Sequence, residues 1–587
     1  NDYHIRLSFI LSHVSGARLE LRAMIMSCTA RLATLFAVVF GLASSHSLHT
    51  FPDLLRYDRA TTKLDGSVSI SATPALLVTS GDWITVSWEN AGVPSTSDWV
   101  GVFTPPVDGS IDLRHHAPVK YQYANYSGSY MNTGVGSLRF QMINMRGDMI
   151  VGFFTGGSQN PVLLAVSDII QFQNYNEPLQ GHLVLGDDPT EVILIWVTQE
   201  ANAPQVLWGT QSNAYTSSKM ASSSTYKAGD MCGSPATDFG FLDPGMLHQV
   251  TMDNLVPGER YFYVFGDPTF GLSQEFSFTA SPITSPDSTV RIVVYGDMGN
   301  GQVDDSLQIM TAQQPALNTT NLIYSQIDQT DLVLHIGDIS YARGYASVWE
   351  EFFHQVQPIA ARAPYMVCIG NHERDFPNSG SYYNGTDSNG ECGVPYEKRF
   401  PMPTPAQDQP WFGFDFGSVH FVLMSTEHRF DSGSAQLQYL DDHLSTVDRS
   451  KTPWLIFAGH RPMYIDSTNW ALPDGDQPVA LLLRAYVEPL LKKYQVDVAF
   501  WGHHHSYQRS CPVFGYQCMK GATTHIVVGM GGQGLSQNID AINPDWLVAL
   551  DDHHWGFSRF TANATTLVFE YVRDDDGQVH DTVVFTK

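Results

Sequence analysis

Short apolar runs, each followed by a glycine and a polar side chain, recur five times between residues 291 and 505. The clearest is LVLHI at residues 332–336, a mostly apolar run whose length predicts a buried strand. Gly337 and Asp338 follow it directly. Four further runs end in the same way, at residues 291–295, 365–369, 454–458 and 496–501. The side chains that follow them are Asp297, Asn371, His460, and His503 with His505.

These polar side chains predict one site. In open α/β sheets, ligands collect at the carboxyl ends of the strands, where these residues are expected to lie. A single Gly-Asp after a strand is more often a turn than a ligand, but five such segments in order are hard to explain as turns. Carboxylate, amide oxygen and imidazole together suit hard or borderline metals rather than a thiolate site. The glycines would let backbone and ligands approach closely.

The region before these runs has the pattern of β-sheet modules. Residues 64–170 hold short β-runs between turns, which predict an immunoglobulin-like sandwich. Residues 171–285 alternate apolar with polar positions and predict a fibronectin III-like sandwich. The stretch 281–287 (SPITSPD) is a candidate linker. Neither module carries clustered ligands, so we expect both to cover the catalytic domain or shape its rim.

Residues 288–587 are expected to form the catalytic domain. Helical stretches at 436–447 and 479–494 separate the predicted strands, and the run 559–585 is expected to return to a sheet. Two sets of strands imply a two-sheet β-sandwich with helices outside. The predicted fold class is therefore multidomain, with two N-terminal all-β sandwich modules followed by an α/β domain.

Residues 1–45 predict an upstream segment and a secretory signal peptide. Arg31 precedes an apolar run at 32–42, which small residues follow at 43–45. This run is too short to span a bilayer, and the alternative is a buried helix. The signal places the protein outside the cell, or in a vacuolar or lysosomal lumen. We expect no membrane span further along the chain.

The net charge is −27, from 32 Lys and Arg against 59 Asp and Glu. Such a chain would repel nucleic acid and anionic membrane surfaces. An anionic substrate would then need local attraction, which a pair of metal ions would supply. Small phosphorylated molecules fit this requirement, whereas nucleic acid does not.

Cysteines and sequons fit a secreted chain. Six cysteines are present, and Cys28 falls in the signal, so an odd number remains. Cys511 and Cys518 flank a short turn and are the preferred disulfide; Cys232 with Cys392 is the second candidate pair, and Cys368 is expected to be a buried free thiol. Four glycosylation sequons, each with chance occurrence as the alternative, begin at Asn125, Asn318, Asn384 and Asn563.

The five segments, in this order, resemble the metallophosphoesterases. Tyr341, three residues after Asp338, narrows the resemblance to the purple acid phosphatases. Further stretches resemble the long, plant-type members with tandem N-terminal modules. These stretches are residues 97–103, 230–235, 383–387, 390–395 and 569–573, so the resemblance covers about 65–587.

The resemblance implies a binuclear metal centre. Ferric iron would be bound by Asp297, Asp338, Tyr341 and His505. A divalent zinc, manganese or iron ion would be bound by Asp338, Asn371, His460 and His503. A bridging carboxylate such as Asp338 can hold two cations about 3.5–4 Å apart, the separation at which both grip one phosphate. His372 is the candidate for proton donation to the leaving group, with a structural hydrogen bond as the alternative.

This chain departs from the family pattern in one stretch. Residues 464–471 contain no histidine, although plant members often carry one or two there, which puts leaving-group handling and substrate preference in doubt. Arg461, His428 and His504 are further candidates for contacts outside the metal ligands. Each has a purely structural alternative.

The function predicted from these residues is a secreted acid phosphatase that hydrolyses phosphate monoesters. A nucleotide pyrophosphatase or phosphodiesterase on the same metal site is the first alternative, and a non-catalytic secreted binding protein is the second. Nucleotides and inositol phosphates are further candidate substrates, and the oligomeric state is open. A serine nucleophile elbow and a phosphate loop followed by lysine are both absent from the sequence.

Overall fold

The computed structural model describes residues 60–64, 66–105, 110–113, 116–309 and 313–587. The predicted signal peptide and Cys28 lie outside these residues. Among the helices that are described, none has the length and apolar content required to cross a bilayer.

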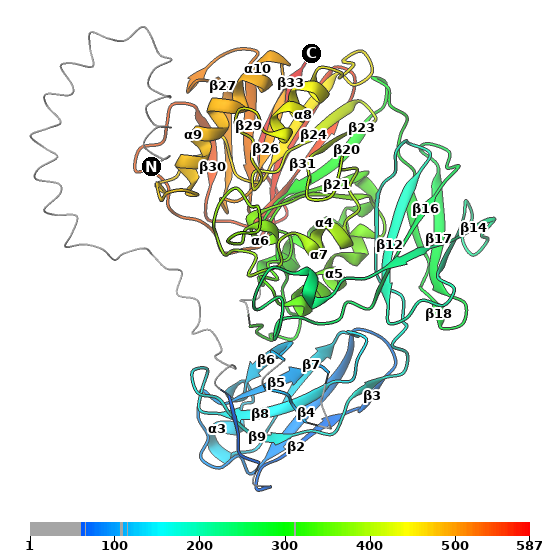
Figure 1. The fold of residues 1–587 in the computed structure, drawn as a ribbon, viewed down its shortest axis with the longest axis vertical. Helices are drawn as coiled ribbons and strands as arrows, with labels where there is room; N and C mark the ends of the chain where they lie inside the picture. The colour runs from blue at the N-terminus through cyan, green and yellow to red at the C-terminus, as the bar shows by residue number, and fades with distance from the viewer. Residues whose placement is uncertain (1–59, 65, 106–109, 114–115, 310–312) are drawn as a thin grey trace, which may run out of the picture. The chain divides into compact units, whose positions relative to one another are not determined.

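The first β-module is a sandwich of a five-stranded and a three-stranded sheet (Figure 1). Burial alternates along its longest strand, where Ile84, Val86 and Trp88 point into the core. The larger sheet has the order β1 (Thr61–Thr62), β9 (Val162–Val166), β8 (Ile150–Thr155), β5 (Trp99–Phe103) and β6 (Lys120–Tyr123). The smaller sheet has β2 (Ser69–Thr73), β4 (Asp82–Glu89) and β7 (Gly136–Met142), and β3 (Leu76–Leu77) pairs with β10 (Gln171–Phe172).

The second module also has two sheets, and its core includes Trp196, Tyr263 and Phe265. One sheet has the order β11 (Leu179–Leu185), β12 (Val192–Thr198), β16 (Met246–Met252) and β15 (Ser222–Ser224). The other has the order β14 (Ser217–Met220), β13 (Gln205–Gly209), β17 (Arg260–Asp267) and β18 (Gly271–Leu272), and β19 (Phe276–Thr279) also pairs with β17.

The α/β domain contains two larger sheets whose facing sides share one apolar core, with Leu334, Ile456 and Phe560 among its members. The six-stranded sheet has the order β22 (Tyr365–Cys368), β21 (Leu332–Ile336), β20 (Val290–Tyr295), β31 (Gly556–Ala562), β32 (Thr566–Arg573) and β33 (Val579–Thr586). The eight-stranded sheet has the order β23 (Phe412–Phe416), β24 (Val419–Leu423), β25 (Trp454–Gly459), β26 (Val498–Trp501), β29 (Thr523–Val528), β27 (Tyr507–Phe514) and β28 (Gln517–Cys518), and β30 (Leu547–Asp551) pairs with β27.

Helices cover the outer face of the eight-stranded sheet (Figure 1). Leu440, Leu483 and Leu491 from three of them share a second apolar cluster with Phe457 of β25. These helices are α8 (Ala435–Leu444), α9 (Asp476–Tyr486) and α10 (Glu488–Lys493). The predicted fold class, tandem β-modules followed by a two-sheet α/β domain with helices outside, is therefore confirmed.

The helix predicted at 479–494 is wrong as a single element. It is two helices, α9 and α10, that meet at Val487. Pro489 is in the first turn of α10, where its missing N–H costs nothing, whereas inside one continuous helix it would remove a hydrogen bond. The apolar spacing continues across the break, so hydrophobic period alone did not show it.

Buried ion pairs connect the first module to the α/β domain. Lys120 of β6 is within 3.2 Å of Asp304 and 3.4 Å of Glu351. Burial alone would lower the pKa of Lys120, but the two carboxylates outweigh it and raise that pKa. Glu350 in α5 (Ala346–Ala360) contacts Arg146 of the first module and Arg399 of α7 (Val394–Arg399), each at 2.8 Å.

Glu350→Ala is expected to lower the free energy of unfolding by about 3–5 kcal/mol, because it leaves two buried guanidinium groups without their carboxylate. Thermal and denaturant unfolding would measure the loss. The exposed Glu259→Ala is the matched control and should change stability by less than about 0.5 kcal/mol. Equal stability of the two variants would show that the Glu350 contacts are energetically neutral.

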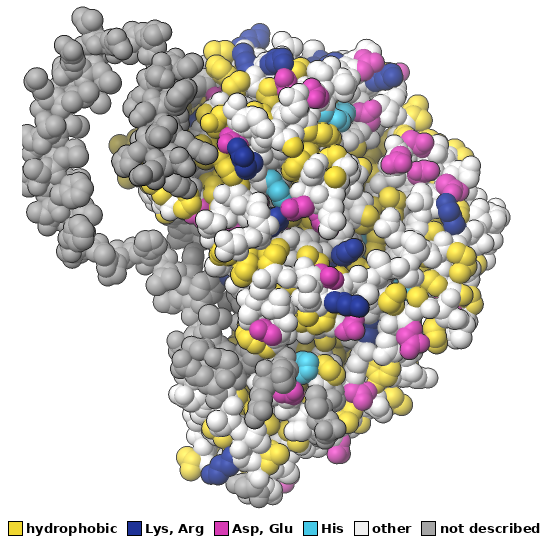
Figure 2. All heavy atoms as spheres, in the orientation of Figure 1, with side chains coloured by type: hydrophobic (Ala, Val, Ile, Leu, Met, Phe, Trp, Pro, Cys, Tyr) yellow, Lys and Arg dark blue, Asp and Glu magenta, His cyan; other side chains and the backbone are white. Residues whose placement is uncertain are grey.

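Charged side chains of both signs are mixed on one face of the molecule. On the face shown in Figure 2, acidic, basic and histidine side chains of the described residues are interspersed rather than gathered in one patch. The described residues on this face therefore form no extended basic patch that would attract an anionic ligand.

Candidate metal centre

The five predicted segments meet at the carboxyl ends of strands from both sheets of the α/β domain. Asp297 follows β20, while Asp338 and Tyr341 follow β21. Asn371 opens the short helix α6 (Asn371–Arg374) after β22. His460 follows β25, and His503 and His505 follow β26. Both sheets thus supply side chains to one cluster.

One group of ligand atoms surrounds Asp338. Ligand atoms of Asp338, His460 and His503 all lie within 4.8 Å of one another. Asn371 Oδ1 is 3.0 Å from His460 Nε2 and 2.9 Å from His503 Nδ1. One carboxylate, one amide oxygen and two imidazoles therefore converge on one point.

A second group surrounds Tyr341. Its hydroxyl oxygen is 3.1 Å from Asp297 Oδ1 and 3.0 Å from His505 Nε2. Asp297 Oδ1 is 3.5 Å from the same His505 nitrogen. This group supplies a phenol, a carboxylate and an imidazole.

Backbone carbonyl groups fix the orientation of two of the imidazoles. His460 Nδ1 donates to the carbonyl of Ile336 at 2.9 Å, and His505 Nδ1 donates to that of Gly534 at 2.6 Å. A carbonyl only accepts, so each Nδ1 carries a proton and each Nε2 faces the cluster, where it would offer its lone pair to a bound cation. This arrangement is the usual outer support of metal-binding histidines.

The electrostatics of the cluster favour a cation. Burial would raise the pKa of Asp338, but His460 and His372 hold it well below its usual range. Burial would likewise lower the pKa of His460, but Asp338 and Asp297 raise it to about 10. Burial, Arg461 and His460 keep the pKa of His503 well below its usual range, so this imidazole is neutral and able to bind a metal.

The residues fit a two-cation centre of the kind that the sequence predicts. Burial, followed by Asp297 and Asp338, raises the pKa of Tyr341 well above its usual value. The phenolate would therefore form only beside a strongly charged cation such as ferric iron. Asp297, Tyr341 and His505 would hold that ion, Asn371, His460 and His503 would hold a divalent ion, and Asp338 would contribute to both.

Glycines make room for these ligands, as the sequence predicts. A Cβ at Gly337, whose φ is +74°, would lie 2.6 Å from His460 Nδ1, and a Cβ at Gly370 would overlap Asp338 Oδ1.

We expect Gly370→Ala to lower metal affinity by about 10- to 100-fold, because the methyl group must displace Asp338. Metal titration would measure this. Gly128→Ala is the control, since nothing lies within 4 Å of its Cβ position; equal affinities would contradict the crowding.

Glu373 fixes the backbone of the segment that carries Asp338, and its role was not predicted from the sequence. Its carboxylate accepts from the backbone N–H groups of Asp338, Ile339 and Gly370 at 3.0, 2.8 and 3.0 Å. Burial, with Asp338 nearby, raises the pKa of Glu373 to about 8. The signal was available, because Glu373 stands three residues after Gly370 at capping-box spacing.

His372 lies at the edge of the cluster. Its Nε2 is 3.7 Å from Asp338 Oδ2 and 3.3 Å from Arg343 Nη2, and its Nδ1 donates to the carbonyl of Asp387 at 3.1 Å. Burial, followed by the charge of Arg343, lowers the pKa of His372 to about 4. Nε2 therefore carries a proton only at acid pH.

The other three candidates occupy different positions. Arg461 is buried and contacts Glu427 and Asp375 at 2.9 and 3.1 Å; its Nη1 is 3.4 Å from His503 Nε2. It thus contacts a ligand from outside. His428 contacts Asp408 and Ser425 rather than a ligand, and the Nδ1 of His504 contacts Ser506.

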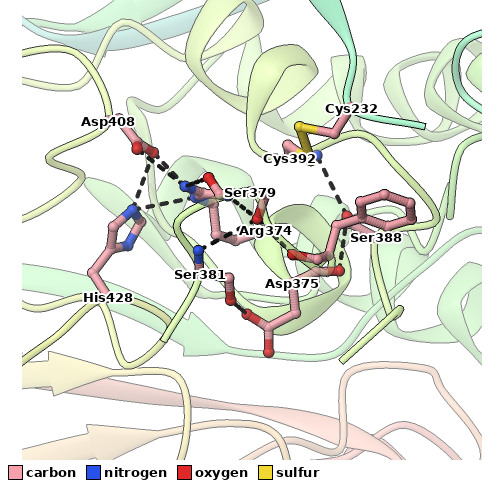
Figure 3. Close-up of a disulfide and its surroundings, with 10 residues drawn as sticks. Cys232, Arg374, Asp375, Ser379, Ser381, Ser388, Cys392, Asp408 and His428 are labelled. Carbon is pink, nitrogen blue, oxygen red and sulfur yellow. Dashed lines mark hydrogen bonds and ion pairs between the residues drawn. A yellow bond between two sulfur atoms is a disulfide. The ribbon is translucent and has the colours of Figure 1, made fainter. Parts of the chain in front are cut away.

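A disulfide joins the second module to the segment whose Asp387 carbonyl contacts His372. Cys232 is bonded to Cys392, and Ser388 connects Cys392 to Asp375 through hydrogen bonds of 3.4 and 3.0 Å (Figure 3). Asp387, whose carbonyl accepts from His372, lies in the same segment. A second disulfide, Cys511–Cys518, closes the hairpin of β27 and β28, and Cys368 is a buried free thiol.

The sequon asparagines differ in exposure. Asn318 and Asn384 are exposed, whereas Asn125 and Asn563 are half-buried. Asn563 Oδ1 accepts from the backbone of Thr565 and Thr566 in a turn. Glycosylation stays a prediction at all four, with Asn318 and Asn384 the more accessible sites.

Known protein families match this chain module by module, in the order in which the structure shows the modules. Family models match four consecutive segments: an Fn3-like domain from purple acid phosphatase at 70–174, the purple acid phosphatase N-terminal domain at 178–280, a calcineurin-like phosphoesterase at 290–507 and an iron/zinc purple acid phosphatase-like C-terminal segment at 522–582. An Arabidopsis thaliana protein named probable inactive purple acid phosphatase 1 is 36% identical over 595 residues, covering 95% of this chain and 96% of the relative. The chain belongs to the purple acid phosphatases.

Two further relatives refine the comparison. The solved structure of a purple acid phosphatase from yellow lupin (Lupinus luteus) seeds matches with a TM-score of 0.83 and 36% identity, covering 89% of this chain and 96% of that one. A barley (Hordeum vulgare) protein named nucleotide pyrophosphatase/phosphodiesterase is 39% identical, covering 53% of this chain and 86% of the relative. The plant-type resemblance predicted from the sequence is confirmed.

Proposed function

We propose that this purple acid phosphatase hydrolyses phosphate monoesters at acid pH with two metal ions held by the cluster. The observation that carries the proposal is that all seven predicted ligands converge at the carboxyl ends of strands from the two sheets. Such a pair of ions, when bound, supplies Lewis acidity and lowers the pKa of bound water from 15.7 towards neutrality. One relative is named probable inactive purple acid phosphatase 1, and that name describes the relative. The catalytic activity of this chain therefore has to be measured.

The side chains of the chain have separate tasks in this reaction. Asp338, His460 and His503 bind cations and so place a positive charge inside a chain of net charge −27. Glu373 fixes the backbone at Asp338, and Gly337 and Gly370 allow close approach. The substrate's phosphate is drawn to this local positive charge rather than to the surface.

His372 is proposed to give a proton to the departing alcohol. Its Nδ1–H is held by the Asp387 carbonyl, so the proton to be transferred must be on Nε2, which faces Asp338 and Arg343. Only the imidazolium carries both protons. Because burial lowers the pKa of His372, that form exists at acid pH, which is where hydrolysis is expected to be fastest.

Cleavage of nucleotide pyrophosphate or phosphodiester bonds is the second candidate. The barley relative carries that activity in its name. The stretch 464–471 offers no histidine for a leaving group. The missing histidine matters less for a pyrophosphate bond, because the phosphate that departs needs no proton. A substrate panel separates the two candidates.

The proposed context is secretion, with glycans on one or more sequons. The two disulfides support an oxidising compartment. Recovery of the protein from culture medium or a vacuolar lumen, with a mass that falls on deglycosylation, would support this. Recovery only as a reduced cytosolic protein would contradict it.

The direct test of activity uses an alkyl phosphate, whose leaving group needs a proton, and the purified full chain, with metal content measured on the same sample. Hydrolysis that is faster at pH 5 than at pH 8, and that disappears with the metals, is the expected result. A chain that retains two metal ions but releases no phosphate from any monoester, diester or anhydride would overturn the catalytic proposal and favour a binding protein.

A further inference from the structure

Two histidines outside the candidate metal centre bring imidazole nitrogens together. The Nε2 atoms of His420 in β24 and His443 in α8 are 3.0 Å apart. Strand β24 belongs to the eight-stranded sheet, and α8 packs on the outer face of that sheet (Figure 1). The pair therefore forms a point of contact between the sheet and the helix that covers it.

This pair is separate from the catalytic candidates. His420 is opposite Leu455 near the amino end of β25, whereas His460 follows the carboxyl end of the same strand. The advance from Leu455 to His460 corresponds to about 16 Å of extended chain. A ligand of the histidine pair would therefore bind away from the seven predicted metal ligands.

Neighbouring side chains orient both imidazoles. His420 Nδ1 is 2.5 Å from Asp415 Oδ1, directly across the ladder between β23 and β24. An ionised carboxylate only accepts, so this Nδ1 carries a proton and Nε2 faces His443. A carboxylate in this position commonly supports a histidine that binds a metal. His443 Nδ1 is 3.4 Å from the hydroxyl oxygen of Tyr439, which can accept a proton from it and leave Nε2 for a metal.

Gly413 makes room for the second imidazole. A Cβ at this position would overlap His443 Nε2, so any other residue would displace the ring. Burial, followed by the charge of His420, lowers the pKa of His443 to about 4, so this imidazole is neutral above that pH. His443 is half-buried and Asp415 is exposed, so water can reach the pair.

Two imidazole nitrogens at this distance either share a proton or bind one ion together. Zinc–nitrogen bonds of about 2.0–2.1 Å place adjacent imidazole nitrogens about 2.9–3.4 Å apart, and the observed 3.0 Å falls in that range. We propose that His420 and His443 bind one divalent transition-metal ion that prefers nitrogen ligands, such as zinc or copper, with water in the remaining positions. The ion connects α8 to β24, so it stabilises the fold and takes no part in hydrolysis.

The binding test uses Cu²⁺, which nitrogen sites generally bind more tightly than zinc and whose electron paramagnetic resonance spectrum reports nitrogen ligands. The full chain, with its catalytic metals already bound, should take up one further ion that is coupled to two nitrogens. His420→Gln and His443→Gln should each weaken this binding at least about 10-fold, and Asp415→Ala about 10- to 100-fold. His554→Gln is the matched control, because it removes another histidine held by a carboxylate, that of Asp551 at 2.9 Å, and should bind Cu²⁺ as the wild type does.

A geometric variant keeps both histidines. In Gly413→Ala the methyl group displaces the end of the His443 side chain, so the chain should fold and bind Cu²⁺ at least about 10-fold more weakly. With the catalytic metals already bound, added Zn²⁺ should raise Tm for the wild type but not for this variant, because the ion binds the folded state. Phosphate hydrolysis should be the same in both. No further ion in the wild type, or equal uptake by the wild type, His420→Gln and Gly413→Ala, would overturn the proposal and leave only a hydrogen bond between the imidazoles.

Discussion

Asp338→Ala is expected to release both metal ions and lower kcat/KM by more than about 1000-fold. The reason is its position, because its carboxylate oxygens are 3.3 Å from His460 Nε2 and 3.7 Å from His372 Nε2, and its backbone N–H donates to Glu373. Loss of this carboxylate leaves His460 and His503 without the negative charge that attracts a cation. Metal analysis and phosphate release on the same sample measure both effects.

Two controls separate this effect from unfolding. Asp187→Ala removes an exposed carboxylate and should leave metals and rate unchanged. Asp338→Asn keeps the shape of the side chain, so a folded Asn variant without metals would attribute the loss to charge. Full activity of Asp338→Ala would contradict the two-metal assignment.

His372→Ala is expected to keep both metal ions and lower kcat by about 100- to 10,000-fold, the range usual for loss of a general acid. Its Nε2 is 3.7 Å from Asp338 Oδ2, but His372 is not one of the seven predicted metal ligands. The loss should be larger for an alkyl phosphate than for p-nitrophenyl phosphate, because nitrophenolate leaves without a proton. The rise in rate towards acid pH should flatten in the variant, since the group with a pKa of about 4 is gone.

The exposed His553→Ala is the matched control and should behave as the wild type. An equal loss on both phosphates would assign His372 a structural hydrogen bond to Asp387 rather than proton donation. Loss of metal together with activity would place His372 among the residues that support the ligands.

The convergence of the seven candidate side chains could be predicted from sequence because each of them follows a strand within a few residues. Asp338 after LVLHI is the example: the apolar run specifies the strand, and the strand end specifies the location of the carboxylate. The tandem β-modules were predicted for a similar reason, since alternation along stretches such as Asp82–Glu89 depends only on which face is buried.

The contacts of the supporting residues could not be predicted in this way, although Arg461 was named as a candidate and Glu373 stands at capping-box spacing. Glu391 fixes Gly344 across 47 residues, and Arg461 meets His503 across 42. Such contacts depend on how distant loops approach one another, which local pattern does not encode. Arg343 gave no signal as a single basic residue in a loop, and the break at Val487 was hidden by apolar spacing that continues through it.

The most direct measurement is the visible absorption spectrum of the purified protein, with metal content determined on the same sample. We expect a broad band in the green, with iron and a second metal near one each per chain, because Tyr341 as a phenolate bound to ferric iron would absorb there. The band should disappear in Tyr341→Phe while the divalent ion stays bound. A colourless protein without iron, whose phosphatase activity is restored by zinc or manganese alone, would contradict Tyr341 as a ligand and the iron-containing centre with it.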